Sequence, residues 1–289
     1  MKDLLSNDVP GLQTLIDESL ECNMCESDVS NILKLSILLY ADDTVVFSES
    51  PHGLQSGLDK VKLYCDKWKL KLNVNKCKIV VFSRGKVRKF PNFKIGEEAI
   101  EVVSNVLYLG LKLNYNNRML VAHKDLYERA SRAMFALLKK CNTLNLPIDL
   151  IFDLFDKTIV PILTYGCEVW GFEQLEILQK LQLKFYKIVL RLRNSTPSLM
   201  LFGETGYYPI WVSIKVRMLC FWFKLVSDQN GNKLSVTIYK LLYASFNNGT
   251  YENAYLKHIR SCLIQVGMPH LWLSQNVSNV KFSWFKSYQ

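Results

Sequence analysis

The sequence predicts an α+β protein in which strands come first and helices follow. Before about residue 120 the apolar residues gather in short runs, most clearly at 35–40 and 44–47. After residue 120 they recur at spacings of three and four, as on one side of an amphipathic helix. Hydrophobic residues make up 49% of the 289 residues and charged residues 21%, so the chain can bury a core. We therefore expect two modules, residues 1–118 and residues 119–289.

The two apolar runs predict a β-hairpin, because an acidic turn joins them and the second run begins with β-branched residues. A helix should follow from Ser50 and Pro51, since serine caps helix starts and proline is tolerated in the first turn. Apolar residues at spacings of three and four predict the side of this helix that faces the core. These residues are Leu54, Leu58, Val61, Cys65 and Trp68.

Strand character returns at 78–83 and again at 106–113. Between these two stretches, residues 85–96 are rich in charge and contain Pro91. That composition predicts a loop or an irregular hairpin, because proline and clustered charge disfavour a buried strand. The first module is therefore expected to hold a small sheet beside one helix.

Helical periodicity dominates the second module. The first helix should bury a stripe formed by Leu126, Ala130, Ala133, Met134, Leu137 and Leu138. A second helix is perturbed by Pro161, and two more are predicted at 174–193 and 211–227. The last stretch is strongly apolar, but cations interrupt it, so it predicts a buried helix and no membrane span. The tryptophans expected in the core are Trp170, Trp211 and Trp222.

The net charge of +10 is unevenly distributed. Residues 1–30 hold one basic and seven acidic residues, so the rest of the chain carries +16. A basic body favours a polyanionic partner, although a soluble basic protein without such a partner would have the same charge. The eight cysteines follow no disulfide-like spacing, and the N-terminus is acidic where a secretion signal would be basic. We expect an intracellular protein, nuclear or cytoplasmic, with reduced thiols.

The acidic turn of the hairpin carries the strongest chemical signal. Asp42 and Asp43 are adjacent carboxylates that repel each other unless solvent or a divalent cation screens them. Mg²⁺ takes oxygen ligands, and two such ions can activate a 3′-hydroxyl and stabilise a leaving pyrophosphate. An Asp-Asp turn without function is the alternative, since aspartate is common in turns. The apolar strands on both sides favour the metal-binding interpretation.

The segment 38–47, an apolar strand, Tyr-Ala-Asp-Asp and a second apolar strand, resembles the catalytic motif of reverse transcriptases. Further segments are similar, in order and spacing, to reverse transcriptases of LINE-type non-LTR retrotransposons. They are 50–55, 64–68, 73–82, 108–110, 163–171 and 203–206 with Pro209. Within 73–82, Cys77 replaces the threonine of the family's usual Lys-Thr pair. The resemblance covers about residues 1–215.

The resemblance implies an RNA-directed DNA polymerase that uses two Mg²⁺ ions, an RNA template, a DNA primer or RNA–DNA hybrid, and deoxynucleotide triphosphates. Asp42 and Asp43 would be the catalytic metal ligands, and Lys76 would contact the triphosphate or protonate the pyrophosphate. The primer terminus would lie over Tyr40 and Ala41. The primer-grip region would be Tyr108, Leu109 and Gly110. Packing in a strand is the alternative role for Tyr40, and a solvated cation is the alternative for Lys76.

The chain also departs from the family. The family's palm has an earlier aspartate motif and a strand–helix motif upstream of Tyr-Ala-Asp-Asp, preceded by fingers. Only 39 residues precede Tyr40 here, and their aspartates lie in polar contexts. These are Asp3, Asp8, Asp17 and Asp28. We therefore expect a truncated palm followed by an α-helical thumb-like module, inactive alone unless a further segment supplies the missing parts. The alternative is a non-catalytic nucleic-acid-binding remnant.

The predicted helix at 174–193 carries a basic stripe. Its cations are Lys180, Lys184, Lys187 and Arg191, at i, i+4, i+7 and i+11. The opposite side should be apolar and consist of Leu178, Leu181, Phe185, Ile188 and Leu192. An amphipathic helix of this kind suits contact with a phosphate backbone, and the alternative is a solvated surface.

Overall fold

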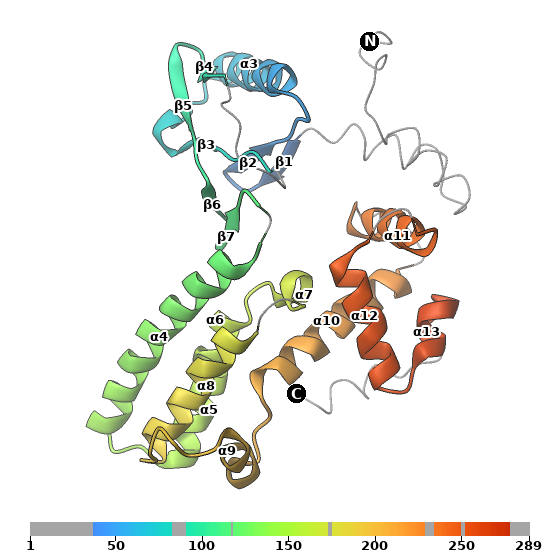
Figure 1. Ribbon diagram of the computed structural model, residues 1–289. Coiled ribbons are helices and arrows are strands. Elements are labelled where there is room, and N and C mark those ends of the chain that lie inside the picture. The colour runs from blue at the N-terminus through green and yellow to red at the C-terminus, as the bar shows by residue number, and fades with distance from the viewer. Residues whose placement is uncertain are drawn as a thin grey trace. The chain divides into compact units, whose positions relative to one another are not determined.

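The computed structural model has small sheets followed by helices, which confirms the α+β class (Figure 1). The residues that it describes are 37–82, 91–116, 118–172, 175–228, 234–249 and 252–277. Residues 1–36, with the four aspartates named above, lie outside this set. The described residues form two compact units, one within 1–74, 90–99 and 222–279 and the other within 75–89 and 100–221. The division at residue 118 stays a prediction.

The first element is the predicted hairpin, here called the YADD hairpin (residues 37–46). Strands β1 (Ile37–Tyr40) and β2 (Asp43–Val46) pair antiparallel, with Tyr40 opposite Asp43. Helix α3 (Pro51–Lys67) follows, and the Ser50 side chain accepts a hydrogen bond of 3.0 Å from the Gly53 amide. Both the hairpin and the capped helix start are confirmed.

One side of α3 packs on β2 and on β4 (Phe93–Ile95). Leu58 and Cys65 are buried on that side, and the Gln55 amide makes two hydrogen bonds, of 2.8 and 3.1 Å, to the Lys94 backbone. The prediction that Trp68 faces the core is wrong, because its side chain is 60% exposed. Helix α3 ends at Lys67, and Trp68 lies at its C-cap.

The central sheet has the strand order β3-β5-β4, with β3 (Lys78–Ile79) parallel to β5 (Glu98–Val102). The strand predicted at 78–83 is therefore only two residues long, and β5 was not predicted. The strand predicted at 106–113 is instead a second hairpin, β6 (Asn105–Tyr108) and β7 (Leu111–Asn114). The chain reverses at Leu109 and Gly110, which both have a left-handed backbone.

Helices make up the rest of the described chain. They are α4 (Leu120–Thr143), α5 (Ile148–Thr158), α6 (Val160–Leu163), α7 (Cys167–Trp170), α8 (Glu176–Val189), α9 (Ser198–Thr205), α10 (Ile210–Ser227), α11 (Leu234–Asn247), α12 (Ala254–Gln265) and α13 (Pro269–Ser274). Helix α4 packs on α5, α6 and α8, around stacked rings of Phe155 and Phe185 whose centroids are 3.9 Å apart. None of these described helices has the length and hydropathy needed to cross a membrane.

The expected placement of the three tryptophans is confirmed for two of them. Trp170 and Trp222 are fully buried. Trp211 is 41% exposed, so the prediction of a core position is wrong for it. Helix α10 spans the predicted range, but Trp211 lies in its first turn, and its ring is covered on one face by Lys215, with Nζ 4.8 Å from the centroid.

Gly171 gives a direct test of the packing between α7 and α10. A Cβ atom at this position would lie 2.4 Å from Ile214 Cγ2 and 2.7 Å from the Cys167 carbonyl oxygen. Gly171→Ala should therefore lower the free energy of unfolding by about 1–3 kcal/mol, measured by urea denaturation. The matched control is Gly203→Ala in α9, where a Cβ meets nothing within 4 Å and alanine should stabilise by about 0.5–1 kcal/mol. Equal stabilities of the two variants would contradict this packing.

Candidate functional site

The tip of the YADD hairpin presents two neighbouring carboxylates to solvent. Ala41 and Asp42 form the turn, and Asp43 is the first residue of β2. Ala41 has a left-handed backbone with φ of 52°, a conformation that costs an L-residue about 1–2 kcal/mol. Tyr40, Ala41, Asp42 and Asp43 are all exposed. The fold therefore tolerates an unfavourable backbone conformation at Ala41, and the turn keeps a small residue and two acidic residues exposed to solvent.

The two carboxylates fit a hard divalent cation. Neither Asp42 nor Asp43 takes part in the ion pairs found among the described residues. Mg²⁺ is commonly held by one or two carboxylates, with water and substrate phosphates as its other ligands. In the described part of the chain, no group of three or more His, Cys, Asp or Glu side chains is placed to hold a metal.

Lys76 ends a short 3₁₀ turn, Val74–Lys76, and is exposed. It takes part in none of the ion pairs between described residues, whereas Lys78 pairs with Glu101 at 2.5 Å. Burial raises the pKa of the Cys77 thiol that follows Lys76. Lys76 belongs to the second compact unit and the two aspartates to the first. With no ion-pair partner among the described residues, the Lys76 ammonium is available to a phosphate ligand.

The segment Tyr108-Leu109-Gly110 ends β6 and forms the turn of the second hairpin, and both turn carbonyls are held by side chains. Tyr165 donates a hydrogen bond of 2.7 Å to the Leu109 carbonyl, and Arg129 donates one of 2.8 Å to the Gly110 carbonyl. The Tyr165 ring also lies 3.4 Å from where a Cβ on Gly110 would be. Sequence reasoning missed Arg129 and Tyr165 as supports of this turn. The signal was present for Tyr165, which lies in the quoted segment 163–171.

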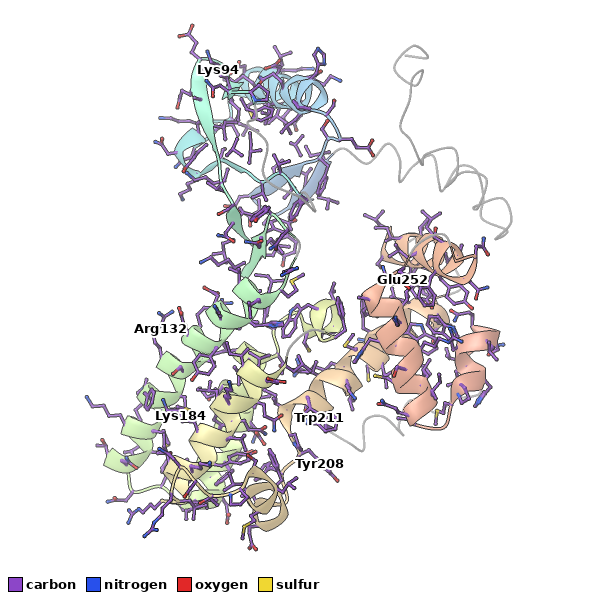
Figure 2. The ribbon with its side chains drawn as sticks, in the orientation of Figure 1. Lys94, Arg132, Lys184, Tyr208, Trp211 and Glu252 are labelled. Carbon is purple, nitrogen blue, oxygen red and sulfur yellow. The ribbon has the colours of Figure 1, made fainter. Side chains whose placement is uncertain are left out.

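Helix α8 carries three of the four predicted stripe cations, here called the α8 lysines (Lys180, Lys184 and Lys187). Figure 2 shows Lys184, whose Nζ lies 4.8 Å from the centroid of the Phe135 ring of α4. Lys187 donates a hydrogen bond of 2.6 Å to the Asn194 carbonyl. The prediction of four cations on one helical face is wrong for Arg191, because α8 ends at Val189 and Arg191 has a left-handed backbone.

The predicted apolar side of this helix holds only in part. Leu178, Leu181 and Phe185 are fully buried. Ile188 and Leu192 are 41% and 40% exposed. The early end of the helix accounts for Leu192, which lies in the turn that follows and whose amide donates a hydrogen bond of 2.9 Å to the Lys187 carbonyl. Ile188 lies in the last turn of α8 itself.

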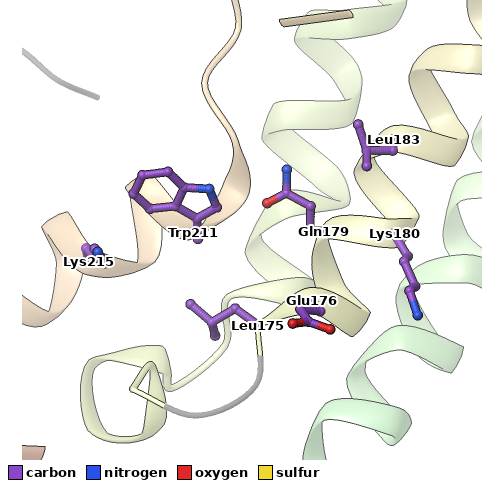
Figure 3. A pocket seen from close by; sticks show the side chains of 7 residues that line it. All are labelled: Leu175, Glu176, Gln179, Lys180, Leu183, Trp211 and Lys215. Atoms are coloured by element: carbon purple, nitrogen blue, oxygen red, sulfur yellow. The ribbon is translucent and has the colours of Figure 1, made fainter. Parts of the chain in front are cut away.

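A groove of about 570 Å³ lies between α8 and the start of α10 (Figure 3). Its lining residues are Leu175, Glu176, Gln179, Lys180, Leu183, Trp211 and Lys215. The Gln179 side chain is turned toward Trp211, and its Oε1 atom is buried with no hydrogen-bond partner in the described part of the chain. Lys180 extends away from the indole. The groove thus offers one aromatic ring and one buried acceptor, and the basic α8 surface lies beside it.

Comparison with known proteins links these features to one family. Residues 13–113 match the family described as reverse transcriptase (RNA-dependent DNA polymerase). The chain is 26% identical over 146 residues to an uncharacterized transposon-derived protein of Caenorhabditis elegans, covering 48% of this chain and 50% of that protein. It is 25% identical over 180 residues to the RNA-directed DNA polymerase from mobile element jockey of Drosophila melanogaster, covering 59% of this chain and 19% of that protein. The chain spans half or less of the length of these relatives, and no solved structure matches it.

Proposed function

Because the chain carries the reverse-transcriptase sequence of a LINE-type non-LTR mobile element, we propose that its YADD hairpin is the metal-binding part of an RNA-directed DNA polymerase site. The observation that carries this proposal is the pair of exposed carboxylates at the tip of an antiparallel hairpin, Asp42 and Asp43. Neither has an ion-pair partner among the described residues. Oxygen ligands of this kind suit Mg²⁺, which when bound activates a 3′-hydroxyl and neutralises the leaving pyrophosphate.

The resemblance to the family assigns tasks to further residues. Ala41 has a small side chain at the turn, so a primer terminus can approach the backbone closely, and Tyr40 supports it from the neighbouring position of β1. Lys76 is exposed and binds the triphosphate or returns a proton to the pyrophosphate. The partners are an RNA template paired with a DNA primer, and deoxynucleotide triphosphates.

The turn of the second hairpin holds the primer strand. Tyr108, Leu109 and Gly110 present a backbone that Arg129 and Tyr165 fix by hydrogen bonds to both turn carbonyls. A fixed turn orients a primer better than a free loop, because less conformational entropy is lost on binding. Tyr165 thus contributes to the turn although it lies 56 residues further along the chain.

A second candidate function is nucleic-acid binding without catalysis. The exposed side chains of Lys180 and Lys184 on α8 favour it, because lysines on one helical face can track a phosphate backbone. Lys187 belongs to the same face but is already engaged with the Asn194 carbonyl. Arg191 contributes a cation beside the end of the helix and lies off its face. This function needs neither metal nor triphosphate, so it is separable from polymerisation.

Primer extension distinguishes a complete polymerase from a part of one. The purified 289-residue chain, given an RNA template, a DNA primer, triphosphates and Mg²⁺ or Mn²⁺, should give no extension. A two-metal mechanism uses more carboxylates than Asp42 and Asp43 supply at one hairpin tip. Binding to the same RNA–DNA hybrid, followed by fluorescence anisotropy, shows in parallel that the chain is folded. Template-dependent extension that disappears in Asp42→Ala would mean that the chain holds a complete site.

A further inference from the structure

Helix α3 exposes one of its sides to solvent. Its residues, here called the α3 outer face, are Lys60, Leu63, Tyr64, Lys67 and Trp68. Each lies three or four residues from another member, so they share one side of the helix. The opposite side holds Leu58 and Cys65 and packs on β2 and β4. The α3 outer face therefore points away from the strands that carry the YADD hairpin.

Two aromatic side chains of this surface are exposed to solvent. Tyr64 is 59% exposed and Trp68 is 60% exposed, whereas Trp170 and Trp222 are fully buried. The two ring centroids are 6.2 Å apart and the ring planes meet at 48°, so the rings do not cover each other. Each ring keeps an open face that an unpaired base can stack on, because every base has a π-face.

The charge on this surface is positive. Lys67 lies 5.9 Å above the Trp68 ring, and Lys60 is exposed one turn before Tyr64. Lys69 and Lys71 follow directly and are exposed as well. The two acidic residues of the region are already engaged within α3, Asp59 by the Gln55 amide and Asp66 by Lys62. The lysines of the α3 outer face have no ion-pair partner among the described residues.

We propose that the α3 outer face binds single-stranded RNA or DNA, with bases stacked on Tyr64 and Trp68 and phosphates on Lys60, Lys67 and Lys71. Aromatic rings between cations are the chemistry of a stacking platform for an unpaired strand. This inference rests on the proposed function in one respect, namely that the ligand is a nucleic acid. It adds a contact on the side of α3 remote from the YADD hairpin, suited to template or displaced strand beyond the paired primer.

A single strand fits this surface better than the other occupants. In a duplex the base faces are stacked within the helix, so exposed rings would gain nothing over lysines alone. A second copy of the chain would bring the same cations into contact with each other, which opposes association. The lysines of this surface therefore favour a polyanionic ligand. The exposed rings favour a polyanion whose bases are unpaired.

Fluorescence anisotropy of a 5′-labelled 12-nucleotide RNA tests the aromatic contact, in EDTA and without triphosphates or primer. Loss of polymerase chemistry therefore cannot change the result. Tyr64→Leu with Trp68→Leu should weaken binding about 25-fold or more, since one base–aromatic stack is worth at least about fivefold in Kd. The salt slope should stay unchanged, because no cation is lost. The matched control is Tyr208→Leu with Trp211→Leu, which are 61% and 41% exposed and should change Kd less than about twofold.

The lysines are tested by the salt dependence of the same titration. Lys60→Gln, Lys67→Gln and Lys71→Gln together should flatten the log–log slope by about 2, at about 0.7 for each single-strand phosphate contact. The control is Lys124→Gln with Lys139→Gln and Lys140→Gln, three exposed lysines of α4 that lie outside both the α3 outer face and the α8 lysines. Equal losses from both triple variants, or from both aromatic pairs, would overturn the proposal in favour of diffuse attraction to a basic chain. A second result would also overturn the proposal. In it, the Tyr64/Trp68 variant keeps the RNA affinity of the parent chain but loses binding to anionic lipid vesicles, or loses self-association measured by sedimentation.

Discussion

Acidification from pH 7 to pH 4 should lower the free energy of unfolding by about 3 kcal/mol through His123 alone. His123 is fully buried in α4, and its ring centroid lies 4.6 Å from that of Trp170. Neither ring nitrogen has a hydrogen-bond partner among the residues that the structure describes. Burial lowers the pKa of His123 from 6.5 to about 4. The folded chain thus keeps the ring neutral, while the unfolded chain takes up a proton below pH 6.5. The stability is complete above that pH and declines as the pH falls toward 4.

Urea denaturation at pH 7, 5.5 and 4.5 measures this effect. His123→Phe keeps a ring against Trp170 and removes the titrating group, so its stability should vary less with pH than that of the parent chain. The difference between the two pH profiles is the result, because the new ring can change the stability at pH 7 by itself. His270→Phe, at an exposed histidine of α13, should keep the parent profile. Parallel profiles for the parent and His123→Phe would assign the acid sensitivity to other groups.

The parts of the fold that sequence could predict depend on local signals. The YADD hairpin and the start of α3 were predicted because apolar runs, an acidic turn and a serine cap act within a few residues. The second hairpin was missed because its turn contains Leu109, whose left-handed backbone is unusual for leucine. The position of Trp211 was missed for a different reason. Periodicity shows that a helix is amphipathic, but not which of its turns reaches beyond the core.

The candidate site also has residues that the sequence could identify and residues that it could not. Asp42 and Asp43 are adjacent in sequence, so their shared chemistry was visible from the motif. Arg129 and Tyr165 support the turn at Leu109 and Gly110 from sequence separations of 19 and 56 residues, which no local pattern reports. The α3 outer face shows the opposite error, since Trp68 was assigned to the buried side by spacing alone. Only packing distinguishes an aromatic ring that faces the core from one that faces solvent.

Metal binding at the YADD hairpin should be lost completely when both carboxylates become amides. Fe²⁺ replaces Mg²⁺ at sites with oxygen ligands, and with peroxide it generates radicals that cut the backbone beside the metal. With an RNA–DNA hybrid present to supply phosphate ligands, cleavage of the chain should concentrate at the turn of Ala41 and Asp42. Excess Mg²⁺ should suppress it by competition. Asp42→Asn with Asp43→Asn should reduce it to background, because an amide carries no charge to hold the ion.

The matched control is Asp59→Asn with Asp66→Asn, two exposed carboxylates of α3 that lie outside the hairpin. This variant should be cut at the turn as strongly as the parent chain. Mass spectrometry of the fragments locates each cut, so this measurement asks directly whether the two aspartates of the YADD hairpin form a metal site. If the two aspartates hold the ion, the parent and the control are cut at that turn and the Asp42/Asp43 variant is not. Cleavage that persists in that variant, or that falls elsewhere in the parent chain, would contradict it.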